Sequence, residues 1–385
     1  NFSKKLTSAI KRITKRKKSY LHEPYFDNDE VKTLNKCVKS TFVSSVGPDV
    51  KNFEKKISKL TGSRYVVAVI NGTSALHLSL KLIGADRDSE ILIPSLNFVA
   101  GANAIKYCEA TPHFVDSDEN SLCVDYYKLK KYLKKQTFIK NGNCYNKTTK
   151  KKIIGLILVH VFGNSNKVPE IKKLCDRYKI NLVEDAAEAI GSYYKKKHLG
   201  TFGKIGILSF NGNKPITTGG GGAILTNDKK IAKKALNLST TGKVPHEWKL
   251  EYNSVAFNYR LPNLNASLGL AQLKKIKKIL SAKKNLYFKY KKVFNQFTEL
   301  KLLDTPKFCK SNYWLNTLIL KSESFSKRNY IINYLNKSGV QARPTWKLLH
   351  KLPHFSKCPK MNLKISEKME KKIINIPSSP IYGMK

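Results

Sequence analysis

The chain has 385 residues, of which 41% are hydrophobic, and this length is enough for two or three domains with a large buried core. Its 72 lysine and arginine residues outnumber the 27 acidic residues and give a formal net charge of +45. The lysines are spread along the whole chain, which favours a lysine-rich surface over a nucleic-acid site, where basic residues cluster with aromatic ones. No run of about 18 apolar residues occurs, so no transmembrane helix is expected.

The seven cysteines are scattered and form no CxxC pair. A disulfide framework and a zinc site are therefore not expected, and a reducing compartment fits best. The first residues lack the apolar stretch of a secretory signal. Together these features predict a cytoplasmic protein with no nucleic-acid partner and no integral membrane association.

Residues 1–20 form a basic N-terminal segment. Its cations cluster at Lys11-Arg12 and Lys15-Arg16-Lys17-Lys18, and its apolar residues recur at helical spacing at Phe2, Leu6, Ile10 and Ile13. Such a pattern suits a basic amphipathic helix with weak attachment to acidic surfaces. The simpler interpretation, which we adopt here, is a solvated tail.

Beyond this segment, strands alternate with helices. Helical patterns cover residues 29–39, 50–60, 76–82, 99–107, 126–135 and 168–178, and apolar strand-like runs cover 65–70, 90–94, 111–116, 153–160, 181–185, 205–210 and 222–226. The polar stretch 140–152 is predicted to be a loop. This alternation predicts an α/β fold whose central sheet is mostly parallel and covered by helices on both faces.

The alternation stops near residue 264. A helix-rich stretch at 264–294 precedes a strand near 313–320, a helix near 326–338 and a proline-rich end. We therefore expect a large domain over residues 21–275 and a smaller C-terminal α+β domain over 276–385.

Three short motifs carry candidate chemistry. The first is Ser209-Phe210-Asn211-Gly212-Asn213-Lys214, followed by the glycine run 219–222. Glycines are tolerated where a backbone approaches a ligand closely, and the alternative is a flexible loop with an incidental lysine. The second is Glu184-Asp185-Ala186-Ala187-Glu188 at the end of a strand, where α/β sheets bind ligands. A cation such as a protonated pyridine nitrogen suits a carboxylate there, and a helix N-cap is the alternative.

The third motif is Asn71-Gly72-Thr73-Ser74, a strand-to-helix turn whose hydroxyls and backbone N–H groups suit a phosphate. An ordinary capping turn is the alternative. One ligand would satisfy all three motifs, because pyridoxal phosphate offers an aldehyde to a lysine, a pyridinium to a carboxylate and a phosphate to a helix start.

The sequence resembles the DegT/DnrJ/StrS family of pyridoxal-phosphate-dependent sugar aminotransferases over residues 21–379, and so implies the type I aminotransferase fold. The resemblance rests on the three motifs, on Asn258-Tyr259-Arg260-Leu261 and on Arg343-Pro344-Thr345-Trp346. Leu21-His22-Glu23-Pro24, Val43-Ser44-Ser45-Val46-Gly47 and Leu352-Pro353 resemble the LegC-type branch, which aminates keto groups on UDP-linked deoxysugars.

The resemblance implies roles for individual residues. Lys214 would bind pyridoxal phosphate covalently, Asp185 would pair with the pyridine nitrogen, and Glu188 would lie near the ring hydroxyl. Phe98 would stack on the ring, and the phosphate would be bound by the turn at Gly72, by Thr73, Ser74 and Ser209, and by Asn258 of a neighbouring subunit. A homodimer with shared active sites follows. Asn97, where the family often has threonine, and Pro215 depart from the family pattern.

Three further residues are candidates for substrate contact, each with a structural role as the alternative: His160, Arg343 and Trp346. His350 and His354 have the spacing of a metal pair, but no neighbouring ligand completes a set, so no metal site is predicted.

The resemblance implies an enzyme that moves an amino group from glutamate to a 4-keto nucleotide-linked deoxysugar, with UDP favoured, for surface polysaccharide or glycan biosynthesis. A GDP- or TDP-linked sugar is the first alternative. Dehydratase relatives replace the lysine with histidine, so Lys214 argues against a dehydratase. A basic binding protein with a vestigial cofactor site is the remaining alternative.

Overall fold

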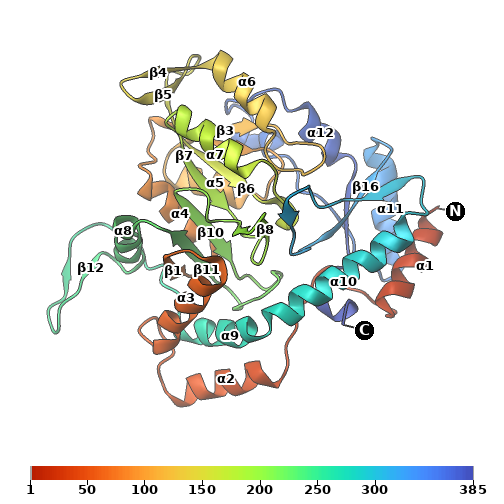
Figure 1. Cartoon of the computed structure of the whole chain (residues 1–385), viewed down its shortest axis with the longest axis horizontal. Coiled ribbons are helices and arrows are strands. Elements are labelled where there is room, and N and C mark those ends of the chain that lie inside the picture. The colour runs from red at the N-terminus through yellow and green to blue at the C-terminus, as the bar shows by residue number, and fades with distance from the viewer. Residues whose placement is uncertain (1, 385) are drawn as a thin grey trace.

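The computed structural model describes residues 2–384 (Figure 1). Its α-helices are α1 Phe2–Thr14, α2 Asn28–Lys39, α3 Pro48–Thr61, α4 Gly72–Leu82, α5 Ala100–Tyr107, α6 Tyr126–Gln136, α7 Val168–Arg177, α8 Lys229–Ser239, α9 Asn263–Lys274, α10 Ile276–Phe294, α11 Phe325–Lys337 and α12 Lys364–Glu370. Short 3₁₀ helices occur at Val161–Gly163, Leu349–Lys351, Pro353–Phe355 and Pro380–Tyr382. Among the helices of residues 2–384, none combines the length and the apolar character needed to cross a membrane.

The strands fall into one large sheet and three small ones. The large sheet contains β1 Tyr65–Val69, β2 Ser89–Pro94, β3 Thr111–Val115, β4 Thr137–Lys140, β5 Asn143–Asn146, β6 Lys152–Val159, β7 Asn181–Asp185, β10 Ile205–Ser209 and β11 Gly222–Thr226. The small sheets contain β8 Tyr193–Tyr194, β9 Lys197–His198 and β15 Cys309–Lys310; β12 Lys243–Val244 and β13 Glu251–Tyr252; and β14 Leu300–Leu302, β16 Asn316–Leu320, β17 Arg343–Pro344 and β18 Ile373–Ile376.

The predicted α/β fold is confirmed, with a central sheet that is mixed. Its main path has the order β1-β11-β10-β7-β6-β2-β3, in which β11 alone runs against its two neighbours. Strands β2, β10 and β11 are buried along their whole length, as strands covered on both faces are. Because β1, β2, β6, β7 and β10 run the same way, their carboxyl ends meet at one edge of the sheet, and this edge holds the site.

The stretch predicted to be a loop at 140–152 is wrong in part, because β4 and β5 form a hairpin there. Asn141 and Gly142 have φ values of 49° and 71°, which suit the tight turn of a two-residue hairpin. Phe138 and Tyr145 stack across the strands with ring centroids 5.4 Å apart. The Asn-Gly pair was the available sequence signal.

The expectation of a solvated N-terminal tail is also wrong. Residues 2–14 form helix α1, whose apolar side is buried in a second hydrophobic core, and Figure 1 shows α1 beside α10 and α11. Leu6 and Ile10 are fully buried there. Farther along the segment, Ser19 pairs with Val340. The basic side chains occupy the exposed side of an amphipathic helix that is attached to its own chain.

Two hydrophobic cores organise the molecule. The first surrounds the large sheet, and the second lies among α1, α10, α11 and the sheet β14-β16-β18-β17. We propose a division into two domains near residue 275, as expected from the sequence, but with α1 assigned to the smaller domain.

The packing of α1 leads to a first prediction. Leu6→Ala should lower the free energy of unfolding by about 2–5 kcal/mol, because it truncates a fully buried side chain and leaves a cavity in its place. Ser8→Ala, on the exposed side of the same helix, should have little effect. Urea unfolding of the two variants tests this, and equal stability of both would mean that α1 is a solvated tail.

Candidate functional site

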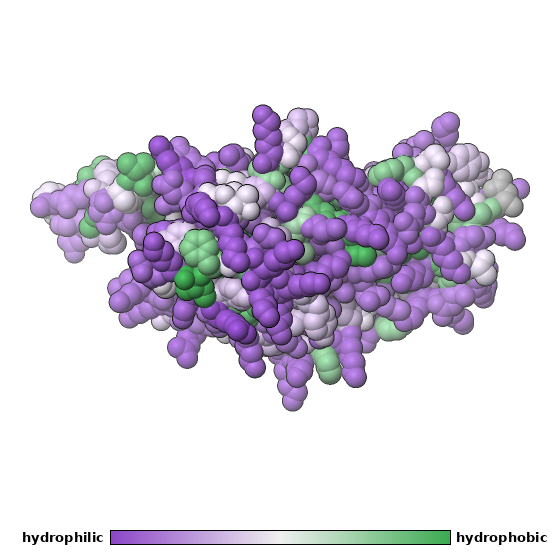
Figure 2. Space-filling model, turned by 90° about the horizontal axis from the view of Figure 1, so that it is seen from above, coloured by the Kyte–Doolittle hydropathy of each residue, from purple (hydrophilic) through white to green (hydrophobic). Residues whose placement is uncertain are grey.

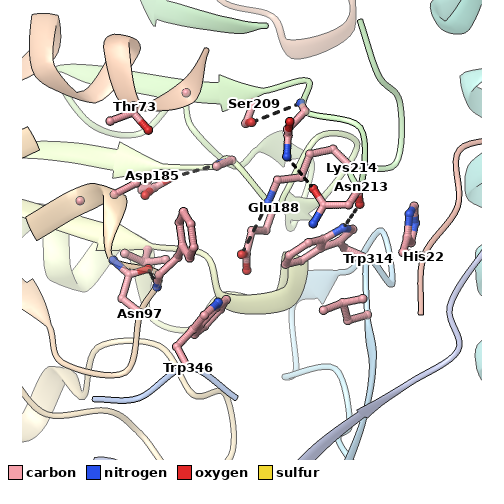
Figure 3. Close-up of a pocket in the computed structure, with 18 of the residues that line it drawn as sticks. His22, Thr73, Asn97, Asp185, Glu188, Ser209, Asn213, Lys214, Trp314 and Trp346 are labelled. Atoms are coloured by element: carbon pink, nitrogen blue, oxygen red, sulfur yellow. Dashed lines mark hydrogen bonds and ion pairs between the residues drawn. The ribbon is translucent and has the colours of Figure 1, made fainter. Parts of the chain in front are cut away.

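A cavity of about 640 Å³ opens at the carboxyl edge of the large sheet (Figure 3). Its walls come from the first turn of α4, the segments after β2, β7 and β10, and segments around Trp314 and Trp346. Most of the predicted site residues line it together: Gly72, Thr73, Phe98, Asp185, Glu188, Ser209, Lys214, Arg343 and Trp346.

Lys214 follows β10 in a turn closed by a hydrogen bond from its backbone N–H to Asn211 O (3.0 Å). Its side chain is buried, and its Nζ lies 3.7 Å from Glu188 Oε1 and 3.8 Å from the centroid of the Trp314 ring. Burial lowers the pKa of the Lys214 amine, and the carboxylates of Glu188 and Asp185 oppose that effect. A buried lysine with a lowered pKa is the form of amine that attacks carbonyl groups.

The two acids at the end of β7 have different surroundings. Glu184 accepts hydrogen bonds from the backbone N–H groups of Gly200, Phe202 and Gly203 and pairs with the His160 ring. Burial alone would raise the pKa of Glu184, but the bond from His160 and the backbone donors hold it below its ordinary value. Glu184 therefore has a structural role.

Asp185, in contrast, faces the cavity. Among the described residues its side chain has one hydrogen bond, from Ala187 N (3.1 Å). Burial raises the pKa of Asp185, although Ala187 N and the nearby cation Lys214 act in the opposite direction. A buried carboxylate with so little compensation is costly, and a cationic ligand group would supply the missing partner.

Glu188 also lines the cavity. Its Oε2 accepts a hydrogen bond from Phe162 N (2.8 Å), and its Oε1 faces Lys214. Burial raises its pKa to about 7, with Lys214 opposing the shift. Near neutral pH this group can therefore hold or release a proton beside the lysine.

This shift predicts a pH effect on stability. The folded protein keeps the Glu188 proton up to about pH 7, whereas the unfolded chain loses it near its ordinary pKa of 4.5. A raised folded pKa stabilises fully below the unfolded value, and the stabilisation is lost as the pH rises through the folded value. Without cofactor, wild-type protein should therefore lose up to about 3 kcal/mol between pH 5 and pH 8 from this group.

The measurement compares wild type with Glu188→Gln by calorimetry over that pH range, with Glu247→Gln, at an exposed position, as control. The Glu188→Gln protein should lack this part of the pH dependence. Parallel curves for wild type and Glu188→Gln would contradict the prediction.

The turn into α4 has the features of an anion site. Asn71 Oδ1 caps the helix by accepting from Ser74 N (2.7 Å), while the N–H groups of Gly72 and Thr73 have no partner within the described residues. A side chain at position 72 would place its Cβ 3.0 Å from that of Ser209, so glycine keeps this corner open. The helix N-terminus and the hydroxyls of Thr73 and Ser209 can together bind a phosphate.

These groups fit pyridoxal phosphate. A cavity with a buried amine at Lys214, an undercompensated carboxylate at Asp185 and an anion site at Gly72–Thr73 presents the three partners that an aldehyde, a pyridinium and a phosphate require. Phe98, about half exposed, also lines the cavity and offers a ring face. Within residues 2–384, no group of three or more His, Cys, Asp and Glu side chains could hold a metal ion.

The structure does not bring His160 into the cavity. Its ring is fully buried, with Nδ1 bonded to Ser165 Oγ and Nε2 to Glu184 Oε1, each at 2.9 Å. Both ring nitrogens are therefore occupied, and the predicted substrate contact is replaced by the structural alternative.

Two other predicted residues lie in a neighbouring cavity. Ser74 and Asn258 line a second cavity of about 350 Å³, which shares Asn71 and Thr73 with the first.

Several lining residues were missed by sequence reasoning. His22, Asn213 and Thr345 line the cavity and stand within motifs of the sequence, but no role was predicted for them. Trp314 also lines it, and no motif marks this residue because a segment distant in sequence brings it to the cavity. His22 Nδ1, Asn97 Nδ2 and Thr345 Oγ1 are buried without a hydrogen-bond partner among the described residues. Buried polar atoms without partners are rare in folded proteins, and these three belong to residues of the cavity wall.

Comparison with known proteins gives one consistent result. Residues 24–383 match the model of the DegT/DnrJ/EryC1/StrS aminotransferase family. The chain is 34% identical to EpsN of Bacillus subtilis, named as a pyridoxal phosphate-dependent aminotransferase, over 88% of this chain and 84% of EpsN. It is 33% identical to a GDP-perosamine synthase of Vibrio cholerae, over 94% of each chain.

Further relatives differ in the nucleotide that their names carry. A UDP-4-amino-4,6-dideoxy-N-acetyl-beta-L-altrosamine transaminase of Campylobacter jejuni is 29% identical over 95% of this chain and 94% of its own. Among solved structures, Helicobacter pylori PseC, an aminotransferase involved in the biosynthesis of pseudoaminic acid, superposes with a TM-score of 0.84 at 25% identity, covering 94% of this chain and 93% of PseC.

Proposed function

Because the chain belongs to the DegT/DnrJ/EryC1/StrS aminotransferase family, whose members are pyridoxal-phosphate-dependent sugar aminotransferases, we propose that it transfers the amino group of glutamate to the 4-keto group of a nucleotide-linked deoxysugar. The observation that supports this most directly is the convergence of Lys214, Asp185 and the first turn of α4 on one cavity. An intact site of this kind disfavours a binding protein with a vestigial cofactor site.

We propose a UDP-linked sugar as substrate, on the strength of the sequence motifs that resemble the LegC-type branch. A GDP-linked sugar is the second candidate, because the GDP-perosamine synthase is more similar to this chain (33% identity) than the UDP-sugar transaminase (29%). In either case Arg343, exposed at the mouth of the cavity, suits a diphosphate, and Trp346 suits a ring of the substrate. Products of such a reaction serve polysaccharide or glycan biosynthesis.

Different residues of the cavity would bind the cofactor and transfer protons. Gly72, Thr73 and Ser209 would hold the phosphate of pyridoxal phosphate, and Asp185 would pair with its ring nitrogen. When bound, this cofactor supplies an electron sink for the substrate carbon. Lys214 Nζ would take the proton from the amino donor's α-carbon and, in the second half-reaction, give a proton to the sugar carbon that receives the amine. This sequence corresponds to ping-pong kinetics.

We also propose a homodimer with shared active sites. Support comes from the arm formed by β12 and β13, which projects from the body in Figure 1; in Figure 2 apolar groups lie along this projection, behind its hydrophilic end. Trp248, Leu250 and Val255 of this arm are mostly exposed, as interface residues of an isolated chain would be. Asn258 follows the arm and is itself exposed beside the second cavity.

The test is an absorbance spectrum of the purified protein with pyridoxal phosphate, before and after glutamate. A visible cofactor band that bleaches with glutamate and returns with a keto sugar is the expected result. A panel of UDP-, GDP- and TDP-linked 4-keto sugars then identifies the acceptor. A protein that binds no cofactor would overturn the proposal. A cofactor band that glutamate leaves unchanged would overturn the choice of glutamate as the amino donor.

A further inference from the structure

Trp314 lies directly against the candidate catalytic amine. The Nζ of Lys214 is 3.8 Å from the centroid of the indole ring, and Figure 3 shows the ring beside the lysine side chain. The indole is buried, so little water competes for the ammonium. A cation is attracted to the face of a tryptophan ring, and more strongly when the pair is desolvated.

The indole is fixed to the same loop as the lysine. Its Nε1 donates a hydrogen bond to the carbonyl of Asn213, the residue before Lys214, at 2.7 Å. Its backbone N–H donates to Asn312 Oδ1 at 2.9 Å. A rotation of the ring would leave a buried donor unpaired, which destabilises the folded protein. These two hydrogen bonds therefore keep the face of the Trp314 ring beside the Lys214 side chain.

A second buried lysine, Lys283, holds the backbone of Trp314 by a hydrogen bond. Lys283 of α10 is fully buried, and its Nζ donates to the carbonyls of Trp314 (3.1 Å) and Ser378 (2.7 Å) and contacts His22 Nε2 at 2.9 Å. Burial lowers the pKa of Lys283, and among the described residues no carboxylate pairs with it. Its bonds tie together three segments around the cavity, at residues 22, 314 and 378.

Lys214 forms an ion pair with Glu188, and this ion pair is a long one. Glu188 Oε1, at 3.7 Å from Nζ, lies beyond hydrogen-bond range. A carboxylate in direct contact would hold the ammonium in a charge-assisted bond. An aromatic face attracts the same charge without a directional bond, so the lysine can leave it and return.

We propose that the Trp314 indole is the resting surface of the Lys214 ammonium whenever the lysine is not bonded to the cofactor. Trp314 is then a positioning residue for both half-reactions, because it keeps the amine within reach of the cofactor and of the substrate carbon. The inference rests on the proposed role of Lys214 as the cofactor lysine.

The contact itself can be tested without cofactor or substrate. The chain has three tryptophans, so 5-fluorotryptophan labelling gives three ¹⁹F signals, assigned by single Trp→Phe variants. Lys214→Met should shift the Trp314 signal. The matched control is Lys249→Met, because Lys249 lies 5.3 Å from the ring of the mostly exposed Trp248, and a smaller shift is expected there. An unchanged Trp314 signal in Lys214→Met would overturn the proposal.

The functional consequence is tested with Trp314→Phe and Trp314→Leu. Both lose the indole donor to Asn213, but only phenylalanine keeps a ring face. Capture of pyridoxal phosphate by the cofactor-free protein, followed by stopped-flow absorbance, should be slowed about tenfold or more in Trp314→Leu and less in Trp314→Phe. Equal slowing would mean that Trp314 acts by packing alone, and the proposal would fall. A wild type that captures no cofactor would defeat the proposed function instead, while the ¹⁹F result still decides the contact.

Discussion

Lys214→Ala is expected to abolish both the visible absorbance of bound pyridoxal phosphate and transamination. Among residues 2–384, Lys214 is the one lysine that lines the cavity, and its buried side chain lies between Glu188 and Trp314. Its loss removes the covalent attachment and the positioned base together. A base alone contributes up to about 10⁴-fold, so the turnover number should fall by at least that factor.

The control is Lys196→Ala, at an exposed lysine of the same lysine-rich chain. This variant should retain both the band and the activity. Spectra and turnover with glutamate and a keto sugar are measured for the three proteins side by side. Residual activity of Lys214→Ala near that of wild type would refute the assignment of the cofactor lysine.

Asp185→Asn should reduce turnover by about 10²–10³-fold, the range for loss of a preorganised charge at a reacting centre. The amide oxygen of asparagine can still accept the hydrogen bond from Ala187 N, so local geometry is kept. What is lost is the negative charge. Because burial raises the pKa of Asp185, its ionised form is costly in the cofactor-free protein, and the variant should melt at the same or a higher temperature than wild type without cofactor.

The neighbouring acid provides the contrast. Glu184→Gln would turn an amide N–H₂ toward the N–H groups of Phe202 and Gly203, which now donate to the carboxylate. We expect a stability loss of about 3–5 kcal/mol, as for breaking a buried pair. Kinetics and thermal melting of both variants therefore separate the two roles. If Asp185→Asn destabilised the protein as much as Glu184→Gln, the functional reading of Asp185 would fail.

The fold was largely predictable because the signals were local. Continuous apolar runs such as 153–160 indicated strands buried on both faces, and β6 spans Lys152–Val159. Glycine and asparagine at strand ends marked the turns that approach the ligand, as at Gly72. The hairpin β4–β5 was missed because its strands are only four residues long, which is too short for an alternating pattern to be recognised.

The site was predictable only in the part carried by contiguous motifs. Lys214, Asp185 and Thr73 stand in three short stretches, each at the end of a strand, and these meet in the cavity. Trp314 and His22 reach the same cavity from segments almost 300 residues apart, and Lys283 links them from α10. Such a meeting depends on the packing of the second core. For the same reason α1 was misjudged, because the partner surface of its apolar side is encoded elsewhere.

The packing of α1 has a consequence for how the protein is made. Leu6 and Ile10 leave the ribosome long before the side chains that bury them, which lie between Leu286 and Tyr382. Most of the first core comes from residues 50–279 and can condense in the meantime, since domains tend to fold as they emerge. Helix α1 must therefore remain with its apolar side uncovered until the segments of the second core have also been synthesised.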